Sequence, residues 1–257
     1  PNDLLKVLKK NKIEFFSGVP DSVLKNFLNS VSLKKNKKHY VCVNEGSAVA
    51  LAIGNYLASG KMGLVYLQNS GLGNALNPLI SIADKRVYSI PMLLLIGWRG
   101  APGLKDEPQH MSKGKITLPI LKNLNIKFVE LKNKNDFSKL NSLIKHGNKK
   151  KLPVAILIKK NTFEKEKSLK KNKSNYLNRS YFLKEILKVI NKNDFLISST
   201  GYTHREIYEL RKRYNLYKGK DFYMVGGMGH TAGVALGSSI AKKNNRTICI
   251  DGDGSLL

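Results

Sequence analysis

The sequence predicts an α/β protein made of two doubly wound parallel-sheet domains, the second of them incomplete. Short apolar strands alternate with helical segments, a pattern typical of parallel sheets that are covered on both faces. A Lys/Asn/Ser-rich segment interrupts the alternation at residues 161–178. The alternation then starts again, but it yields few strands before the sequence stops.

These observations predict domains at residues 1–160 and 179–257, joined by a linker at 161–178. The 257 residues, 42% of them apolar, suffice for two domains with cores of their own. No apolar run is long enough to span a membrane and no signal-peptide pattern is present, so we expect a cytoplasmic protein. Cys42 and Cys249 each lie in a strand-like run, so we expect buried free thiols. The sequence does not begin with Met, and we expect both ends to be cut.

The elements of the first domain follow from their apolar patterns. Short apolar or β-branched runs predict strands, and longer stretches with apolar residues at helical spacing predict helices. The predicted strands are 13–17, 39–44, 63–68, 92–97, 126–131 and 153–158. The predicted helices are 23–31, 46–59 and 72–83.

The second domain repeats the pattern over fewer elements. Its last strand is a β-branched run that leads directly into a Gly-Asp-Gly turn. The predicted helices are 181–190, 203–214 and 230–242. The predicted strands are 195–199, 222–225 and 247–250.

The chain is strongly basic, with 45 Lys and Arg against 18 Asp and Glu and a net charge of +27. One interpretation is a basic, non-catalytic nucleic-acid-binding protein. Lysines spread over solvated faces are favoured instead, because the basic runs are not interleaved with aromatic residues and no nucleic-acid module is visible. A positive field would also favour an anionic substrate.

Two glycine motifs follow predicted strands, where parallel sheets bind their ligands. Gly71-Leu72-Gly73 is a weak dinucleotide signal, because Leu76 stands where the third glycine belongs. In Gly252-Asp253-Gly254 the carboxylate could ligate Mg²⁺, and the glycines would allow a phosphate to approach closely. A simple tight turn explains the second motif equally well.

Glu45 is the unusual residue of the first domain. It follows a run, Val41-Cys42-Val43, that we expect to be a buried strand, and it precedes a helix of small residues. A carboxylate there either complements the helix dipole or serves a ligand at the edge of the sheet. Taken alone, the position favours the dipole.

Taken together, Glu45, the Gly-Asp-Gly turn and the glycine turn at 226–229 resemble the thiamine-diphosphate-dependent decarboxylases. Longer stretches are similar to the phosphonopyruvate decarboxylases, with the sulfopyruvate decarboxylases sharing the general plan. The resemblance covers nearly the whole chain apart from the Lys/Asn-rich segments. Its most specific stretch is GWRGAPGLKDEPQH, residues 97–110, which has no role in a generic fold. The other stretches are FFSGVPDSVLKNF, NEGSAVALAIGNYLASGK, VYLQNSGLGNALNPLISIAD, SSTGYTHREIYELR and GGMGHTAGVALG.

The resemblance implies a pyrimidine-binding domain at 1–160 and a diphosphate-binding domain at 179–257. In such enzymes the cofactor lies between domains of different subunits, so at least a dimer is implied. Gly-Asp-Gly opens a longer metal-binding motif that closes with an Asn pair further on. Only the opening is present here, so the resemblance implies a C-terminally truncated chain.

The activity implied is the decarboxylation of 3-phosphonopyruvate to phosphonoacetaldehyde and CO₂ in phosphonate biosynthesis, with thiamine diphosphate and Mg²⁺ as cofactors. Sulfopyruvate or another anionic 2-oxo acid is the alternative substrate. Retention on nucleic acid that depends on salt, without cofactor binding, would support the non-catalytic alternative instead.

The resemblance also implies roles for individual residues. Glu45 matches the glutamate that hydrogen-bonds the aminopyrimidine ring, and Met228 matches the apolar wedge that holds the cofactor bent. Asp253 matches the metal ligand. The cofactor-binding positions are Thr200, Gly201, Tyr202, Gly227, Met228, Gly229, His230, Gly252, Asp253, Gly254 and Ser255.

The expected substrate contacts come from the first domain. His110, predicted to lie in a long irregular loop, is a candidate acid/base or anion contact. Arg99 could pair a phosphonate through its planar fork. Asp21 and Ser22 match a turn that faces the substrate in related decarboxylases, and capping of the following helix explains them equally well.

Overall fold

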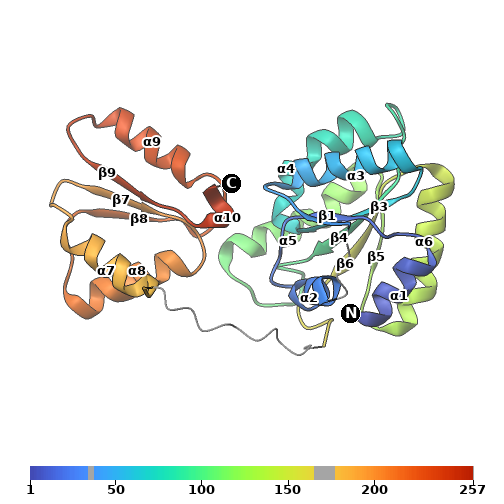
Figure 1. Ribbon diagram of the computed structural model, residues 1–257, viewed down its shortest axis with the longest axis horizontal. Coiled ribbons are helices and arrows are strands. Elements are labelled where there is room, and N and C mark those ends of the chain that lie inside the picture. The colour runs from blue at the N-terminus through green and yellow to red at the C-terminus, as the bar shows by residue number, and fades with distance from the viewer. Residues whose placement is uncertain (34–37, 165–176, 257) are drawn as a thin grey trace. The chain divides into compact units, whose positions relative to one another are not determined.

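The computed structural model describes residues 1–33, 38–164 and 177–256, which fold as an α/β protein with two parallel sheets (Figure 1). The predicted class, with a second, smaller sheet, is therefore confirmed. The chain divides into two compact units, Pro1–Lys170 and Lys171–Leu257. Most of the predicted linker, residues 165–176, lies outside the described residues, and the predicted domain boundaries stay a prediction.

Unit 1 contains a six-stranded sheet in the order β2-β1-β3-β4-β6-β5, in which every neighbouring pair is parallel. The chain runs from β1 outward to β2 and then returns across β1 to β3. The switch of direction therefore lies between β1 and β3. The strands are β1 (Phe16–Gly18), β2 (His39–Val41), β3 (Gly63–Gln68), β4 (Met92–Gly97), β5 (Lys127–Glu130) and β6 (Val154–Ile158).

Helices cover both faces of this sheet (Figure 1). Alternate residues of β3 and β4 point to opposite faces, so each strand contributes to two separate cores. One core involves α3, α4 and α5, and the other α1, α2 and α6. The α-helices are α1 (Asn2–Lys10), α2 (Lys25–Leu33), α3 (Glu45–Ser59), α4 (Leu72–Pro78), α5 (Pro108–Asn123) and α6 (Phe137–Lys150). The shorter turns are the 3₁₀ helices η1 (Asn69–Gly71) and η3 (Lys134–Asp136) and the π-helix η2 (Leu79–Ala83).

The boundaries of α3 and α4 have local causes. The Asn44 side chain accepts a hydrogen bond from the backbone N–H of Ser47 at 2.9 Å, which caps α3, and Gly60 ends the helix at φ +65°. The predicted single helix 72–83 is interrupted at Pro78, which has no N–H to donate, and it continues as a π-helical turn.

The prediction of a buried strand over 41–43 is wrong. Val41 and Val43 are 64% and 49% exposed, because β2 is the edge strand of its sheet and stops at Val41. The cysteines are free thiols, as expected, but they are less buried than expected. Cys42 is half-buried beside this edge, and Cys249 is exposed on β9.

Unit 2 has a three-stranded parallel sheet in the order β8-β7-β9, with α7 and α8 on one face and α9 on the other (Figure 1). Its small core lies between α7, α8 and the central strand. Across the described residues no helix has the length and apolar character needed to cross a bilayer. The strands are β7 (Phe195–Ser198), β8 (Lys220–Tyr223) and β9 (Thr247–Ile250). The helices are α7 (Arg179–Lys188), α8 (Tyr202–Tyr214), α9 (Thr231–Ala241) and α10 (Asp253–Leu256).

Candidate active site

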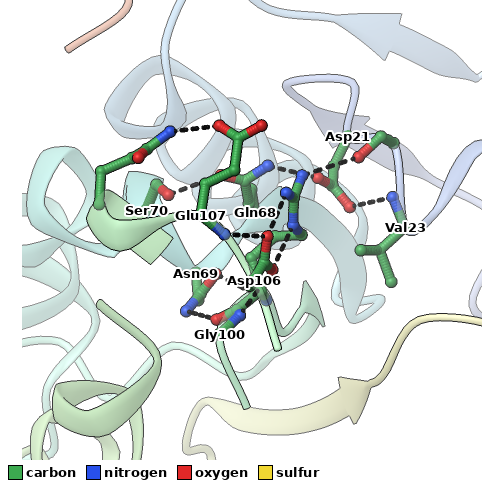
Figure 2. A network of polar contacts seen from close by, with 11 residues as sticks. Asp21, Val23, Gln68, Asn69, Ser70, Gly100, Asp106 and Glu107 are labelled. Carbon is green, nitrogen blue, oxygen red and sulfur yellow. Dashed lines mark hydrogen bonds and ion pairs between the residues drawn. The ribbon is translucent and has the colours of Figure 1, made fainter. Parts of the chain in front are cut away.

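Polar side chains gather in unit 1 beyond the carboxyl ends of β1, β3 and β4 (Figure 2). This edge includes the switch point between β1 and β3, where the loops that leave the two strands diverge and ligands of parallel sheets bind. The site residues predicted for unit 1 all lie on segments that follow β1, β2 and β4.

Glu45 is the first residue of α3 and is 7% exposed. Its Oε2 accepts a hydrogen bond from Nδ2 of Asn74 at 2.8 Å, and Asn74 lies on α4. A Cβ atom on Gly71 would lie 2.0 Å from Oε1 of Glu45, so the carboxylate occupies space that a side chain at position 71 would fill. The structure therefore holds this carboxylate in one place.

Asp21 is buried and saturated with hydrogen-bond donors. Its Oδ2 accepts from the backbone N–H groups of Val23 and Leu24 at 2.8 and 3.1 Å. Its Oδ1 accepts from Nε2 of Gln68 at 2.6 Å, and the Ser70 hydroxyl donates to Oε1 of Gln68 at 2.6 Å (Figure 2). This geometry supports the capping interpretation of Asp21, because Oδ2 already serves the turn before α2 and Oδ1 is bound to Gln68 at the end of β3.

Arg99 already has a carboxylate on one edge of its guanidinium. Its Nε and Nη2 donate to the two oxygens of Asp106 at 2.7 and 2.5 Å. Asp106 also accepts from the backbone N–H groups of Gly100 and Glu107, both at 2.9 Å (Figure 2). The hydrogen-bonded Arg99 guanidinium holds the pKa of the Asp106 carboxyl far below its usual range. The remaining end of Arg99 carries Nη1, 3.4 Å from the hydroxyl of the exposed Ser22.

Asn69 fixes the backbone of Arg99 and is absent from the predicted site. Its Oδ1 accepts from the Arg99 N–H at 3.0 Å, and its Nδ2 donates to the Arg99 carbonyl at 2.9 Å. The same Nδ2 donates to Oγ1 of Thr117 on α5 at 2.9 Å. The buried amide thus joins the end of β3 to the loop after β4. A polar residue directly after an apolar strand is the only sequence signal of this role.

His110 corrects a prediction, because it lies in the first turn of α5 and not in an irregular loop. Pro108 at the start of a helix is a signal for this turn. Nδ1 of His110 is buried and has no hydrogen-bond partner among the described residues. Burial, and after it the charge of Arg99, lower the pKa of His110 from its ordinary value. The imidazole is therefore mainly neutral near pH 7, a state that can accept or donate a proton.

In unit 2 the three loops beyond the carboxyl ends of the strands are linked to one another. Oγ1 of Thr200, after β7, donates to the carbonyl of Val225, after β8, at 3.1 Å. The Gly229 N–H donates to Oγ of Ser255 at 2.9 Å, which joins the glycine turn to the segment after β9. Met228, between these contacts, is about half exposed.

The other predicted cofactor positions of unit 2 lie on the same loops. Three of the glycines have left-handed backbone angles, namely Gly201 at φ +100°, Gly227 at +73° and Gly229 at +90°. The remaining predicted positions lie next to these glycines or next to β9, at Tyr202, His230, Gly252, Asp253 and Gly254.

These loops contain buried oxygen atoms that nothing in the described protein satisfies. They are Oγ of Ser198, Oγ of Ser199 and Oδ2 of Asp251, at the ends of β7 and β9. Buried polar atoms without partners are rare in folded proteins and call for an explanation, such as a ligand or water. The two serine hydroxyls therefore fit a polar ligand such as the diphosphate of the cofactor that the resemblance implies, whereas the Asp251 oxygen accepts only and would need a donor or a cation.

Asp253, the predicted metal ligand, is the exposed first residue of α10. Among the residues that the structure describes, no three His, Cys, Asp or Glu side chains gather closely enough to hold a metal ion. Mg²⁺ prefers oxygen ligands and usually keeps waters and substrate phosphates among them. A single carboxylate beside a diphosphate therefore fits this ion better than a site built wholly from protein side chains.

Comparison with protein families gives two matches. The profile described as "Thiamine pyrophosphate enzyme, N-terminal TPP binding domain" matches residues 2–118. The profile described as "Thiamine pyrophosphate enzyme, C-terminal TPP binding domain" matches residues 198–257. The two matches fall on unit 1 and unit 2 respectively.

Two curated relatives and one solved structure are similar to the chain. The phosphonopyruvate decarboxylase of Streptomyces viridochromogenes is 30% identical over 99% of this chain and 66% of that protein. The sulfopyruvate decarboxylase subunit alpha of Methanococcus maripaludis is 31% identical over 60% of this chain and 90% of that subunit. The crystal structure of benzoylformate decarboxylase from Polynucleobacter necessarius matches with a TM-score of 0.50 and 21% identity, over 77% of this chain and 37% of that chain. This last similarity concerns the fold alone.

Proposed function

The chain belongs to the thiamine pyrophosphate enzyme family, and from this premise we propose that it acts in the decarboxylation of an anionic 2-oxo acid, with thiamine diphosphate and Mg²⁺. The chain spans 66% of the length of two curated phosphonopyruvate decarboxylases that it matches. The observation that carries the proposal is the buried Glu45 carboxylate, held at the ligand-binding edge of the sheet in unit 1.

Bound thiamine diphosphate would supply the electron sink that decarboxylation of a 2-oxo acid requires. In unit 1, the Glu45 carboxylate would hold a proton at the pyrimidine ring nitrogen of the cofactor. A carboxylate held in a single position suits this role, because proton transfer depends first on geometry and then on pKa. Gln at this position would keep the shape and lose the charge.

Unit 2 would bind the diphosphate and the metal. Backbone N–H groups of the glycine loops, together with the unpartnered hydroxyls of Ser198 and Ser199, are suitable donors for phosphate oxygens. Asp253 would ligate Mg²⁺, which in turn would neutralise part of the diphosphate charge. Met228 is exposed on the glycine turn and would provide the apolar contact to the cofactor.

We propose 3-phosphonopyruvate as the substrate and phosphonate biosynthesis as its setting. Arg99 would bind the phosphonate through Nη1, which donates to the Ser22 hydroxyl at 3.4 Å, because Asp106 occupies the other edge of the guanidinium. His110, mainly neutral near pH 7, would donate or accept a proton close to the substrate. Asp21 would act indirectly, by shaping the turn that carries Ser22.

Sulfopyruvate is the second candidate substrate, and the similarity to a sulfopyruvate decarboxylase subunit supports it. A phosphonate carries more negative charge than a sulfonate at neutral pH, and the net charge of +27 favours the more highly charged anion. We also propose that the protein works as at least a dimer of this chain.

The decisive experiment is a decarboxylation assay of the full-length protein with thiamine diphosphate, with and without Mg²⁺. CO₂ release should be fastest with 3-phosphonopyruvate, slower with sulfopyruvate and slowest with pyruvate, and a chelator should abolish it. Arg99→Ala should reduce turnover of phosphonopyruvate more than turnover of pyruvate. Absence of turnover with all three acids, together with absence of cofactor binding in calorimetry, would overturn the proposal.

A further inference from the structure

Gly71 opens the Gly-Leu-Gly motif after β3, and its backbone does not require a glycine. Its φ and ψ angles are −83° and −3°, which any residue adopts with ease. Gly73, two residues later on α4, also has no positive φ, and a Cβ there would meet nothing within 4 Å. Neither backbone therefore requires a glycine, and the two positions differ in what surrounds the missing side chain.

The surroundings of Gly71 are the carboxylate of Glu45. A Cβ atom at position 71 would lie 2.0 Å from Oε1, 2.2 Å from Cδ and 2.5 Å from Cγ of Glu45. Cβ atoms essentially never approach other heavy atoms so closely, so an alanine would displace this side chain. The atoms displaced would be the flexible end of one residue and not the backbone.

Asn74 binds the other oxygen of the same carboxylate, Oε2. It follows Gly71 by three residues, close to one helical turn, and its Nδ2 donates to Oε2 of Glu45 at 2.8 Å. The backbones of α3 and α4 also approach each other closely here, because a Cβ on Gly46 would lie 3.0 Å from the Asn74 carbonyl oxygen. Among the described residues no hydrogen-bond donor reaches Oε1.

We propose that Gly71 and Asn74 are positioning residues that seat the Glu45 carboxylate. Asn74 holds Oε2, and the missing side chain of Gly71 leaves Oε1 in place and open to a ligand. The inference rests on the proposed role of Glu45 and gives the Gly-Leu-Gly motif a function other than dinucleotide binding. Gly71 and Asn74 would set the position of the Glu45 carboxylate and would not contact the cofactor or the substrate.

The first test compares Gly71→Ala with Gly73→Ala in the full-length protein, using calorimetric affinity for thiamine diphosphate with Mg²⁺, turnover and thermal unfolding. Gly71→Ala should weaken cofactor affinity by about tenfold and lower turnover by about 100-fold, since a displacement of about 1 Å has that effect on a reacting group. Gly73→Ala should leave both within about twofold. The two variants should unfold at similar temperatures.

The second test asks whether Gly71 acts through Glu45. In a Glu45→Ala background no carboxylate remains to be displaced, so adding Gly71→Ala should change cofactor affinity no further. Asn74→Leu should weaken affinity. Asn77→Leu should not, because Asn77 lies one turn further on the same helix and its side chain accepts a hydrogen bond from the Ser81 hydroxyl. If Gly71→Ala weakens cofactor affinity as much in the Glu45→Ala background as in the unmodified protein, Gly71 serves the fold and does not position Glu45. That result would overturn the proposal.

The outcomes separate this inference from the proposed function. If Glu45→Ala abolishes turnover while Gly71→Ala behaves like Gly73→Ala, the positioning role of Gly71 is wrong and the role of Glu45 stands. If Glu45→Ala changes neither cofactor affinity nor turnover, the proposed role of Glu45 is wrong, and so is the positioning role of Gly71 and Asn74.

Discussion

The two units use the same strand–helix alternation, but they differ in how far they satisfy their own polar groups and bury their strands. In unit 1, β4 and β6 are buried along their whole length, and β3 is buried except at its last residue. In unit 2, β8 and β9 are half-exposed. The Glu45 carboxylate of unit 1 has a donor, and Nδ1 of His110 is a buried atom of this unit without a partner among the described residues. In unit 2 such atoms lie together on the loops, at Ser198, Ser199 and Asp251.

This difference indicates two kinds of site. The carboxylate of unit 1 is held by protein groups before any ligand arrives, so unit 1 should behave as a preorganised framework. The loops of unit 2 leave buried oxygens whose partners would have to come from a ligand or water. Unit 2 should therefore gain more from ligand binding than unit 1.

The largest expected effect tests the preorganised carboxylate. Glu45→Gln keeps the shape and the Asn74 contact but removes the charge, so turnover should fall by about 10²–10⁴-fold, the usual contribution of a positioned acid or base. Cofactor binding and the melting temperature should change little. Steady-state kinetics measure the turnover, and calorimetry measures the cofactor binding. Near-normal turnover would remove Glu45 from the mechanism.

The next effect tests how tightly unit 1 is packed around His110. Gly100 has φ +64°, and a Cβ there would lie 1.9 Å from the His110 carbonyl oxygen, a backbone atom that cannot move aside easily. Gly100→Ala should lower the free energy of unfolding by about 3 kcal/mol through clash and backbone strain.

The matched control for this packing is Gly103, which has φ +83° and open space around it. Gly103→Ala should cost about 1 kcal/mol, the strain alone. Urea unfolding of both variants, followed by a probe in unit 1 such as Trp98 fluorescence, gives the two values. Equal losses would mean that the contact with His110 is not tight.

A third prediction concerns the dependence of unit 2 on its ligand. A ligand at a hundredfold of its dissociation constant stabilises the state that binds it by about 2.7 kcal/mol. Hydrogen exchange should therefore slow in α8, α9 and the loops of unit 2 when thiamine diphosphate and Mg²⁺ are added, and it should change little in β3 and β4. Asp253→Asn should remove most of this protection.

The control for Asp253 is Glu209→Gln, which removes an exposed carboxylate from α8 without touching the loops. It should leave the ligand-dependent protection intact. Equal protection of both units by the ligand would contradict the comparison drawn above.

The smallest effect is a pH dependence of unit 1. Burial lowers the pKa of His39 and, together with Arg99, that of His110, so the folded state binds fewer protons than the unfolded state below pH 6.5. Stability is therefore full above about pH 6.5 and is lost as the pH falls toward the lowered values. Each group can contribute at most about 1.4 kcal/mol per pH unit.

His39→Gln tests this pH dependence with little change in shape, because an amide can still reach the Tyr66 hydroxyl that lies 2.9 Å from Nε2 of His39. Melting temperatures between pH 7.5 and 5.5 should fall less steeply in the variant than in the unmodified protein. Identical slopes would show that His39 does not contribute.

The sequence by itself determined the fold class and the elements whose pattern is local. The strands 63–68, 92–97 and 247–250 were predicted with the limits that the structure has, because continuous apolar runs between polar turns need no distant partner to be recognised. The predicted roles of Glu45, of the glycine turns and of Asp253 stay predictions, now with a geometry.

Only the tertiary structure decided the features that depend on segments far apart in the chain. The run 41–43 is exposed because, among the strands that the structure describes, none pairs with the outer side of β2, and a local pattern carries no information about neighbours. The helices α1, α5 and α6 are not among the predicted elements, and α5 contains Gly114 and Pro119, which weaken a helical signal.

The same holds for the polar contacts of the site. Asp106 occupies one edge of Arg99, Asn69 fixes the Arg99 backbone, and Gly71 leaves space for Glu45. The partners in the last two pairs are separated by 30 and 26 residues in the sequence, so no local pattern relates them. Residue types and strand positions follow from local chemistry, whereas the partner of each side chain follows only from how the parallel sheet brings its loops to one edge.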